Sequence, residues 1–283
     1  MRKNLKDNNK GITLIALAIT IIVLVILAGV SIAALKGDNG IINEAKDAKA
    51  TNEKAQVQEE IELATIQALK NDNNTISKMR DYLQSKFPSM KIDTETTTYI
   101  RFDYKDQDIV VDDTGKVTVI EKVEPDNTEE WNFDSRTGTL TCIEGTTFSS
   151  GNIYENLVIP NYYKGQKVKI FNTNDDYFGN ICNVKAKKVI LSDGIEKIGE
   201  KALGELKAEE IYLSKTLLTI GRLAISHNYI KELSIPKSVE NIEVEGIGDN
   251  DLLQTIKCER SSDSGWNESW NKTNANVVYG YNQ

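Results

Sequence analysis

Residues 189–199 read VILSDGIEKIG, residues 211–221 read IYLSKTLLTIG and residues 233–243 read LSIPKSVENIE. The three segments begin at Val189, Ile211 and Leu233, a constant period of 22, and four apolar columns run through them without a gap. Each unit continues with a small residue and then a fifth apolar position, at Leu203, Ile225 and Ile247. One unit of this size cannot bury its own apolar face, whereas stacked units build a continuous core. The repeat therefore predicts a solenoid in which every unit places a short strand beside the strand of the unit before it.

Weaker copies of the pattern lie on either side of these three units. Residues 157–160, followed by Val168 and Phe171, predict an earlier and longer unit. Residues 253–258 predict a final partial strand, and residues 131–140 look like the start of the repeat domain. A period of 22 falls within the range of about 20–29 residues that leucine-rich repeats use.

The pattern V-x-L-[SP]-x-x-[IVL]-x-x-I-G, followed by alanine and an apolar residue, resembles the BspA-type leucine-rich repeat of bacterial surface proteins. The resemblance covers residues 131–283, which is more than half of the chain. It implies a leucine-rich-repeat solenoid that presents the exposed face of its strands to a ligand. The implied role is binding or adhesion at the cell surface.

Alternate residues of a strand point to opposite faces, so every strand of the solenoid should show some side chains to solvent. The outward positions are expected at Ile190, Tyr212 and Ser234, flanked by Lys188, Glu210 and Glu232. These side chains share no common chemistry, so they leave the ligand open between a protein and a glycan. Tyr212 is the best single anchor, because tyrosine is enriched among the residues that dominate interface energies. We expect binding to map to this face and not to the β-rich stretch at 91–123.

The N-terminal segment is strongly apolar, since residues 12–35 carry no charged side chain. As a helix they would span about 36 Å, which exceeds the roughly 30 Å hydrocarbon core of a bilayer. The leader before them, residues 1–11, carries a net charge of +3. This pattern predicts a single transmembrane helix whose N-terminus stays in the cytoplasm, with everything after the helix outside the cell.

The junction between leader and helix reads KGITLI from Lys10 onward, and it resembles the N-terminus of type IV prepilins. The resemblance implies cleavage after Gly11 by a prepilin peptidase, methylation of Ile12 and pilin-like subunits as partners. In that family a glutamate at the fifth mature position helps to set the register between subunits, and here that position is Ala16. A plain uncleaved signal anchor and a cleaved signal peptide remain as alternatives.

Between the apolar segment and the repeats the sequence predicts a stalk helix, a small α+β region and a linker, at residues 36–75, 76–123 and 124–130. The α+β region begins with a short helix that Pro88 stops. Alternating strands follow at 99–104, 108–111 and 116–120. Residues 112–115, DDTG, predict a hairpin turn, which explains their paired carboxylates better than a calcium site does. One helix against a small antiparallel sheet is also what the pilin resemblance implies.

The composition argues against several classes of function. A net charge of −8 and a pI near 5.0 argue against a phosphate-binding surface and therefore against nucleic acid as a partner. The chain has one histidine, His227, which makes a catalytic triad or a histidine-rich metal site improbable. Its three cysteines, Cys142, Cys182 and Cys258, show no CxxC pairing. We therefore expect no enzymatic activity, no metal and no cofactor.

Two further features lie within the repeats. Cys258 falls in the column of Leu191, Leu213 and Ile235, which predicts a buried apolar role, although an extracytoplasmic location would also permit a disulfide. Trp266 and Trp270 are four residues apart, a spacing that places them on one helical face. We expect the pair to cap the open end of the solenoid, with a sugar-stacking platform as the alternative.

Together these patterns predict a membrane-anchored α+β protein. A transmembrane, pilin-like helix with a small antiparallel sheet precedes a leucine-rich-repeat solenoid. The predicted function is extracytoplasmic binding or adhesion to an unidentified protein or glycan. One alternative is a structural minor subunit of a type IV pilus or secretion pseudopilus, and another is a plain signal-anchored surface protein that is not processed.

Overall fold

The computed structural model describes residues 41–71, 75–126, 128, 131–142, 153–172 and 184–281. The chain forms two compact units, residues 1–63 and residues 64–283, which divide within one long helix. The predicted transmembrane segment 12–35 and the predicted processing site at Gly11 and Ile12 lie outside the described residues. Among the helices that are described, none combines the length and the apolar character needed to cross a bilayer.

The long helix is α2 (Ile41–Lys70), and its residues 41–63 make up the described part of the first unit. Its sequence contains neither glycine nor proline and is rich in alanine, glutamate, lysine and glutamine, all of which favour a helix. A helix is therefore observed within the predicted segment 36–75, over Ile41–Lys70, while its role as a stalk stays a prediction. A second helix, α3 (Ile76–Lys86), begins where Thr75 Oγ1 accepts a hydrogen bond from Lys78 N and ends before Pro88.

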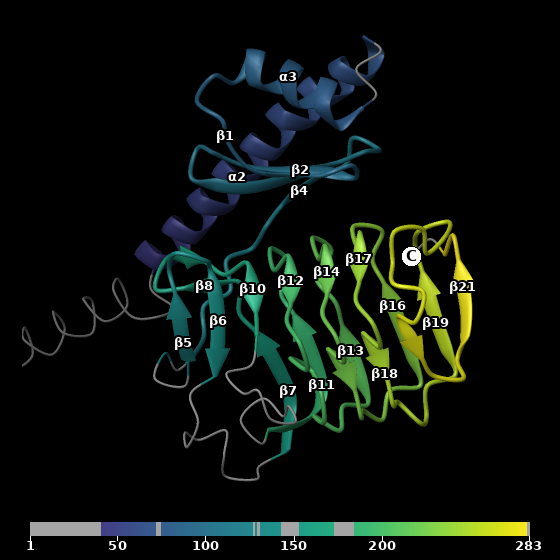
Figure 1. The fold of residues 1–283 in the computed structure, drawn as a ribbon. Coiled ribbons are helices and arrows are strands. Elements are labelled where there is room, and N and C mark those ends of the chain that lie inside the picture. The colour runs from purple at the N-terminus through teal and green to yellow at the C-terminus, as the bar shows by residue number, and fades with distance from the viewer. Residues whose placement is uncertain are drawn as a thin grey trace, which may run out of the picture. The chain divides into compact units, whose positions relative to one another are not determined.

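A small antiparallel sheet follows α3, with strand order β1-β2-β3-β4 (Figure 1). Its strands are β1 (Lys91–Glu95), β2 (Tyr99–Tyr104), β3 (Gln107–Asp112) and β4 (Val117–Val119). The predicted hairpin turn joins β3 to β4, and Gly115 adopts φ +84° there, a conformation that favours glycine. Asp112 Oδ1 accepts hydrogen bonds from the backbone N–H groups of Thr114 and Lys116, each at 2.9 Å. The turn therefore uses this carboxylate to hold its own backbone.

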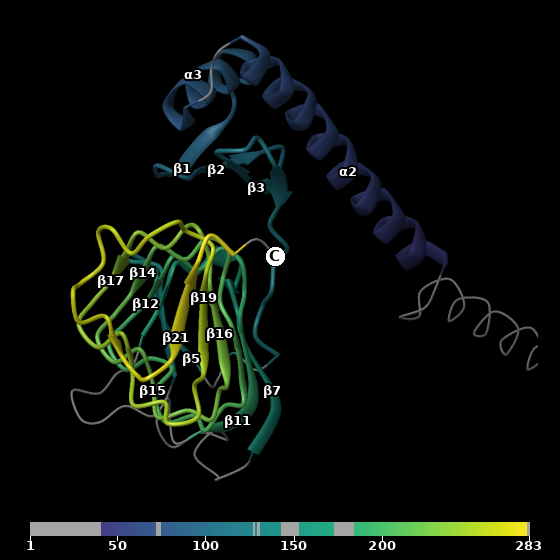
Figure 2. The same cartoon turned by 90° about the vertical axis from the view of Figure 1, so that its right-hand side faces the viewer.

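The repeats form a solenoid whose coils are bounded by parallel ladders (Figures 1 and 2). It opens with an antiparallel hairpin, β5 (Trp131–Asp134) and β6 (Thr139–Cys142), at the predicted start of the domain. The hairpin continues into a ladder of parallel two-residue strands, β10 (Ile170–Phe171), β12 (Lys197–Ile198), β14 (Thr219–Ile220) and β17 (Asn241–Ile242). In this ladder Ile198, Ile220 and Ile242 lie opposite one another, and all three are fully buried. The predicted register of the repeat is therefore confirmed.

The longer strands of the repeats lie on the other side of the coils, as Figure 2 shows. They are β7 (Ile153–Ile159), β11 (Lys185–Leu191), β13 (Glu210–Tyr212), β16 (Glu232–Ile235), β19 (Thr255–Cys258) and β21 (Asn276–Tyr279). We call their exposed side the strand face. A third set of short strands closes the coils, namely β15 (Ile225–Ser226), β18 (Ile247–Gly248) and β20 (Asn271–Lys272), and β8 (Tyr162–Tyr163) pairs with β9 (Gln166–Lys167) in a separate hairpin.

Two expectations about the end of the solenoid need correction, the last strand and the backbone around the tryptophans. The strand expected to be last, at 253–258, is followed by β20 and β21, so the solenoid continues. Leu233 pairs with Ile256 and not with the residue at position 255, so this coil is longer than the regular period. Trp266 and Trp270 lie in turns and not on a helix, because the backbone there follows the tight coils of the solenoid. Both rings are buried, with centroids 5.0 Å apart, which fits the capping role and leaves no open platform for a sugar.

A ladder of buried asparagines holds the turns that lead into the longer strands. Asn250 Oδ1 accepts a hydrogen bond from Asn228 N at 2.9 Å, and Asn228 Oδ1 accepts one from Ala208 N at 3.1 Å. Both amide groups also donate to backbone carbonyls of the coil before them. The spacing of 22 between the two asparagines was the signal that could have predicted this ladder.

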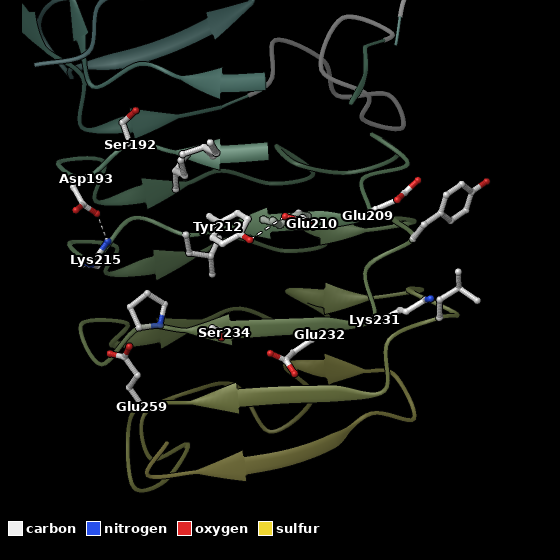
Figure 3. A pocket seen from close by; sticks show the side chains of 17 residues that line it. Ser192, Asp193, Glu209, Glu210, Tyr212, Lys215, Lys231, Glu232, Ser234 and Glu259 are labelled. Carbon is white, nitrogen blue, oxygen red and sulfur yellow. Dashed lines mark hydrogen bonds between the residues drawn. The ribbon is translucent and has the colours of Figure 1, made fainter. Parts of the chain in front are cut away.

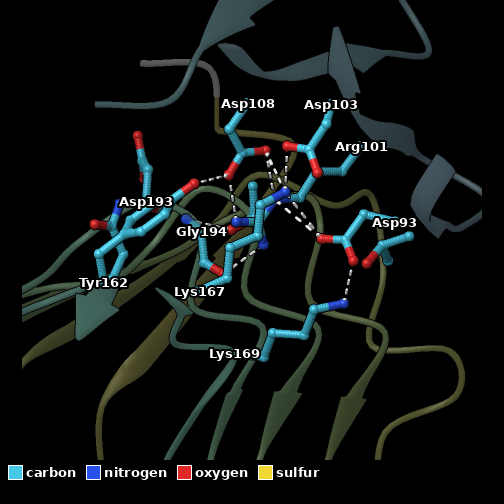
Figure 4. A network of polar contacts seen from close by, with 12 residues as sticks. Asp93, Arg101, Asp103, Asp108, Tyr162, Lys167, Lys169, Asp193 and Gly194 are labelled. Carbon is cyan, nitrogen blue, oxygen red and sulfur yellow. Dashed lines mark hydrogen bonds and ion pairs between the residues drawn. The ribbon is translucent and has the colours of Figure 1, made fainter. Parts of the chain in front are cut away.

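The small sheet is joined to the solenoid by a buried polar network within the second unit (Figure 4). Arg101 on β2 is fully buried and donates to both carboxylate oxygens of Asp108, through Nε at 3.0 Å and Nη2 at 2.7 Å. Its Nη1 donates to the carbonyl oxygen of Gly194 at 2.7 Å and to Glu196 at 3.0 Å, both on the solenoid. The small sheet is therefore held by specific bonds to the turns of the repeats.

Lysines of the solenoid complete this network from the opposite side. Lys167 lies 3.2 Å from Asp108 Oδ1, and Lys169 donates to Asp93 at 2.6 Å. Burial alone would raise the pKa of Asp108, but the hydrogen bonds and charge of Arg101 outweigh it and hold that pKa below the usual range. The pKa of Asp93 is lowered in the same way, as Lys169 and Lys167 outweigh the effect of burial. The carboxylates are therefore ionised at neutral pH.

Candidate functional site

A hollow of about 800 Å³ lies on the strand face, at the point where the sheet divides (Figure 3). Strand β13 ends one ladder, with order β13-β11-β7, and β16 begins another, with order β16-β19-β21. Residues of both ladders line the hollow, among them Tyr212 from β13 and Ser234 from β16. The interruption of the ladder therefore leaves room between two neighbouring coils for a ligand.

Tyr212 is the largest side chain that projects from the middle of this hollow. Tyr212 is 51% exposed, whereas the preceding residue of the strand, Ile211, points to the core and is buried. The Tyr212 hydroxyl donates to Glu210 Oε2 at 2.9 Å, and the Lys188 ammonium lies 4.4 Å from the centroid of the ring. The hydrogen bond to Glu210 and the charge of that carboxylate raise the pKa of Tyr212 above its ordinary value. The phenol is therefore a protonated, oriented group at neutral pH.

The structure brings the six residues expected on the strand face together. Lys188 lies opposite Glu210, and Ile190 lies opposite Tyr212, in the β11–β13 ladder. Five of the six line the hollow, namely Ile190, Glu210, Tyr212, Glu232 and Ser234. Lys188 lies beside it, over the tyrosine ring and 3.8 Å from Glu210 Oε2. The outward orientation derived from strand alternation is thus observed, while the role of these residues in binding stays a prediction.

The hollow has further walls that the repeat pattern did not predict. Tyr229 and Leu252 line it from the loops that enter β16 and β19, and they are 49% and 48% exposed. Their separation along the chain equals that of Leu233 and Ile256, which pair between β16 and β19, so the two occupy equivalent places in successive coils. A search of the loop columns for exposed apolar residues could have found them.

The far end of the hollow is formed by three charged residues in the turns that follow the strands, Asp193, Lys215 and Glu259. Figure 3 shows them at one end, with Tyr212 in the middle and Glu209 and Lys231 at the other end. Asp193 Oδ1 accepts a hydrogen bond from the backbone N–H of Lys215 at 2.7 Å, which fixes the carboxylate on the next coil. The hollow therefore follows the direction of the strands, from their entry loops to their exit turns.

The other residues discussed from the sequence lie away from this hollow. Cys258 pairs with Ile235 in the β16–β19 ladder and is fully buried, as its column predicts, and burial raises the pKa of its thiol to about 12. Cys142 is also buried, while Cys182 lies outside the described residues. His227 is half-exposed in a turn with φ +56°, 3.9 Å from Asp249. Its surface position agrees with the sequence.

Comparison with known families agrees with the repeat architecture. The model of the BspA type leucine rich repeat region, present in six copies, matches residues 127–243 and 172–276. The chain belongs to the BspA-type leucine-rich repeat family. The BspA-type region contains all residues of the hollow described above. No curated protein matches the sequence.

Proposed function

We propose that this BspA-type protein binds a partner through the hollow of the strand face, with Tyr212 as the central anchor. The observation that carries the proposal is a half-exposed tyrosine held by Glu210 and Lys188 in the middle of a hollow of about 800 Å³. A large aromatic side chain that is already fixed loses little conformational entropy on binding. The membership in a family of surface repeats supports a role in protein binding or adhesion.

The proposal includes a location outside the cell. The apolar, uncharged segment 12–35 after a basic leader supports a single-pass membrane anchor with the repeats on the outer side. In this arrangement the strand face meets partners in the medium, on a matrix or on another cell. N-terminal sequencing of the membrane fraction tests the anchor: a chain that begins at Ile12 supports prepilin-type processing, a chain that begins at Met1 leaves a plain anchor, and a start near Ala34 contradicts anchoring.

Replacement of Tyr212 by alanine tests the binding site. We expect Tyr212→Ala to weaken binding of the partner by about 5- to 30-fold, which corresponds to about 1–2 kcal/mol, while the unfolding midpoint stays unchanged. Tyr82→Ala is the matched control, because Tyr82 on α3 is also a surface tyrosine with a lysine, Lys86, over its ring. The measurement is a titration of the purified full-length chain against the partner that is recovered from the growth medium or from the surface to which the cells attach. Equal affinity of the two variants would move the site away from Tyr212.

A structural role in a pilus or pseudopilus is the second candidate. It is favoured by the order of elements in the N-terminal half, where a long helix precedes α3 and a four-stranded antiparallel sheet. Deletion of the protein separates the two functions. Loss of filaments supports the structural role, whereas normal filaments with lost attachment support binding.

A further inference from the structure

A second hollow, of about 470 Å³, adjoins the first and is walled by the small antiparallel sheet. Its solenoid wall includes Asp193, Lys215 and Glu259, the same three residues that end the hollow on the strand face. Its other wall comes from β2, β3, β4 and the 112–116 turn. Because the two hollows share residues, a ligand that follows the strands past Lys215 reaches the small sheet without leaving the surface depression.

We propose that the ligand, if the binding role above holds, is an extended polypeptide segment of basic character that occupies both hollows. The strand-face hollow already follows the strand direction, and the five residues 209–213 span about 13 Å at the rise of a β-strand. A ligand that continues into the second hollow must be longer than these five residues. Such a length suits a peptide or protein segment.

The charges of the two hollows identify the sign of the ligand. Among the described residues that line them are seven carboxylates and four lysines, a difference of three negative charges. The carboxylates are Asp112, Asp113, Asp193, Glu209, Glu210, Glu232 and Glu259, and the lysines are Lys116, Lys215, Lys231 and Lys237. Lys237 and Asp113 neutralise each other, since Lys237 Nζ donates to both oxygens of Asp113, and this pair leaves the difference unchanged. Beside the lining, Lys257 lies 2.6 Å from Glu232 and Lys188 lies 3.8 Å from Glu210, so the charge that a ligand meets is smaller than this difference. Lysine and arginine side chains of a ligand would complement this surface.

Exposed apolar side chains are available in the hollow of the strand face. Tyr212, Tyr229 and Leu252 are each about half exposed in the first hollow. In the second, Val110 and Ile120 line the wall next to the solenoid, but both are buried, so the exposed apolar area lies mainly in the first hollow. An extended chain directs alternate side chains to opposite sides, so it can place apolar residues against these sites and basic residues toward the carboxylates.

A glycan fits the same surface less well. Sugar rings bind by stacking on an open aromatic face, but the ammonium group of Lys188 lies over the ring of Tyr212 at 4.4 Å. The ring of Tyr229 is likewise approached by Lys207, at 5.6 Å from its centroid. Both exposed tyrosines of the hollow thus already have a cation on one face. A polypeptide can pack against the edges of these rings, which does not require an open ring face.

The test is a selection of random 12-residue peptides displayed on phage against the purified full-length chain. We expect the selected peptides to be rich in lysine or arginine and in apolar residues. One selected peptide, labelled with a fluorophore, is then titrated against variants by fluorescence anisotropy. Tyr212→Ala reports the strand face. Thr118→Lys reports the second hollow, since Thr118 lines it on the edge strand β4, where a lysine is tolerated.

We expect Thr118→Lys to lower the affinity for the basic peptide by about two- to fourfold, as for one added like charge at about 5–8 Å in water. Lys116→Glu should raise that affinity. Gln84→Lys is the control, because it adds the same charge on α3, at a residue outside both hollows. Weakening by Tyr212→Ala with no effect of Thr118→Lys would overturn the extended path and leave the proposed binding site intact. Acidic or neutral selected peptides, or specific binding on a glycan array that Tyr212→Ala abolishes, would overturn the basic polypeptide. Unchanged peptide affinity in both Tyr212→Ala and Thr118→Lys would contradict the proposed function as well.

Discussion

Replacing Arg101 with methionine removes the guanidinium group through which the small sheet is bonded to the solenoid. The side chain is fully buried, and its three nitrogen atoms donate to Asp108, to the Gly194 carbonyl and to Glu196. Methionine retains most of the apolar stem and fills much of the same volume. The substitution therefore tests the polar bonds and not the packing.

The expected loss of unfolding free energy follows from the polar groups that lose their bonds to Arg101. Asp108 loses both hydrogen bonds from Arg101 and keeps contacts with Lys167 and the Tyr162 hydroxyl, each at 3.2 Å. The Gly194 carbonyl loses a 2.7 Å hydrogen bond. Removing one partner of a buried ion pair costs about 3–5 kcal/mol, because the other charge stays in a poorly solvated place. We expect a loss of unfolding free energy in this range.

Tryptophan fluorescence during urea unfolding measures this effect at the solenoid. The chain has three tryptophans, Trp131, Trp266 and Trp270, and all of them are buried in the repeats, whereas Arg101 lies on the small sheet. For a unit of this size a slope of about 3 kcal/mol per molar urea converts the loss into a midpoint shift of about 1–2 M. A shift seen by these tryptophans shows that the small sheet stabilises the repeats.

Two further variants give this experiment its controls. Arg80→Met removes an arginine that pairs with Glu95 inside the small α+β region, on a partly exposed surface, and should leave the urea midpoint nearly unchanged. Combining Arg101→Met with Asp108→Leu also removes the buried Asp108 carboxylate, so the double variant should regain part of the lost unfolding free energy. An unchanged tryptophan midpoint in Arg101→Met would refute the reasoning, because the solenoid would then be stable without the network.

Two other predictions concern stability. Ile220→Asp should be severely destabilising, because Ile220 is fully buried between Ile198 and Ile242, and a melting temperature within a degree or two of wild type would contradict the register. The second concerns pH. The pKa values of Asp93 and Asp108 are lowered from 3.8 in the folded state, so their stabilisation is complete above about pH 4 and is lost as the pH falls through the folded-state values. Urea midpoints should therefore vary little between pH 7 and 5 through these groups and fall below pH 4, and a loss centred between pH 5 and 7 would point to other groups.

The core of the solenoid could be predicted from the sequence because stacking repeats the same environment. Ile198, Ile220 and Ile242 face the same kind of neighbour above and below, so each coil demands the same residue type at that point. The outward orientation of Tyr212 followed from the same register, since a strand alternates its faces. Sequence reasoning was reliable wherever one coil resembles the next.

The hollow and its extension could not be predicted in this way, because they arise where the coils differ. The division of the sheet between β13 and β16 has no signature in the apolar columns, which run through it unchanged. The burial of both faces of β2 also depends on a surface from elsewhere in the chain. Its alternation is visible in the sequence, but Arg101 looks there like a solvated charge until the solenoid turns are placed over it.

One column of the repeats did carry a signal for the small sheet. Glu196, Leu218 and Glu240 follow the period of the repeat and lie at the same place in three successive coils. Glu196 bonds to Arg101 at 3.0 Å, and Glu240 accepts hydrogen bonds from Thr97. The leucine in the middle packs against the apolar cluster of the small sheet. An apolar residue in an otherwise charged outward column marks a covered surface.

The contact with successive coils shows what the small sheet requires of the repeat. A sheet that bonds to equivalent positions of neighbouring coils requires those positions to keep a constant spacing in space. The period is constant through Glu240, and the longer coil comes afterwards, between β16 and β19. The coil before Glu196 carries Lys169 in the same column, since Ile170 pairs with Lys197, and Lys169 donates to Asp93 of the small sheet at 2.6 Å. The interval from Lys169 to Glu196 is longer than the regular period of 22, although the small sheet bonds to both residues. The bonded column therefore keeps its place in the ladder across an insertion, because strand pairing and not chain length sets the spacing between neighbouring coils.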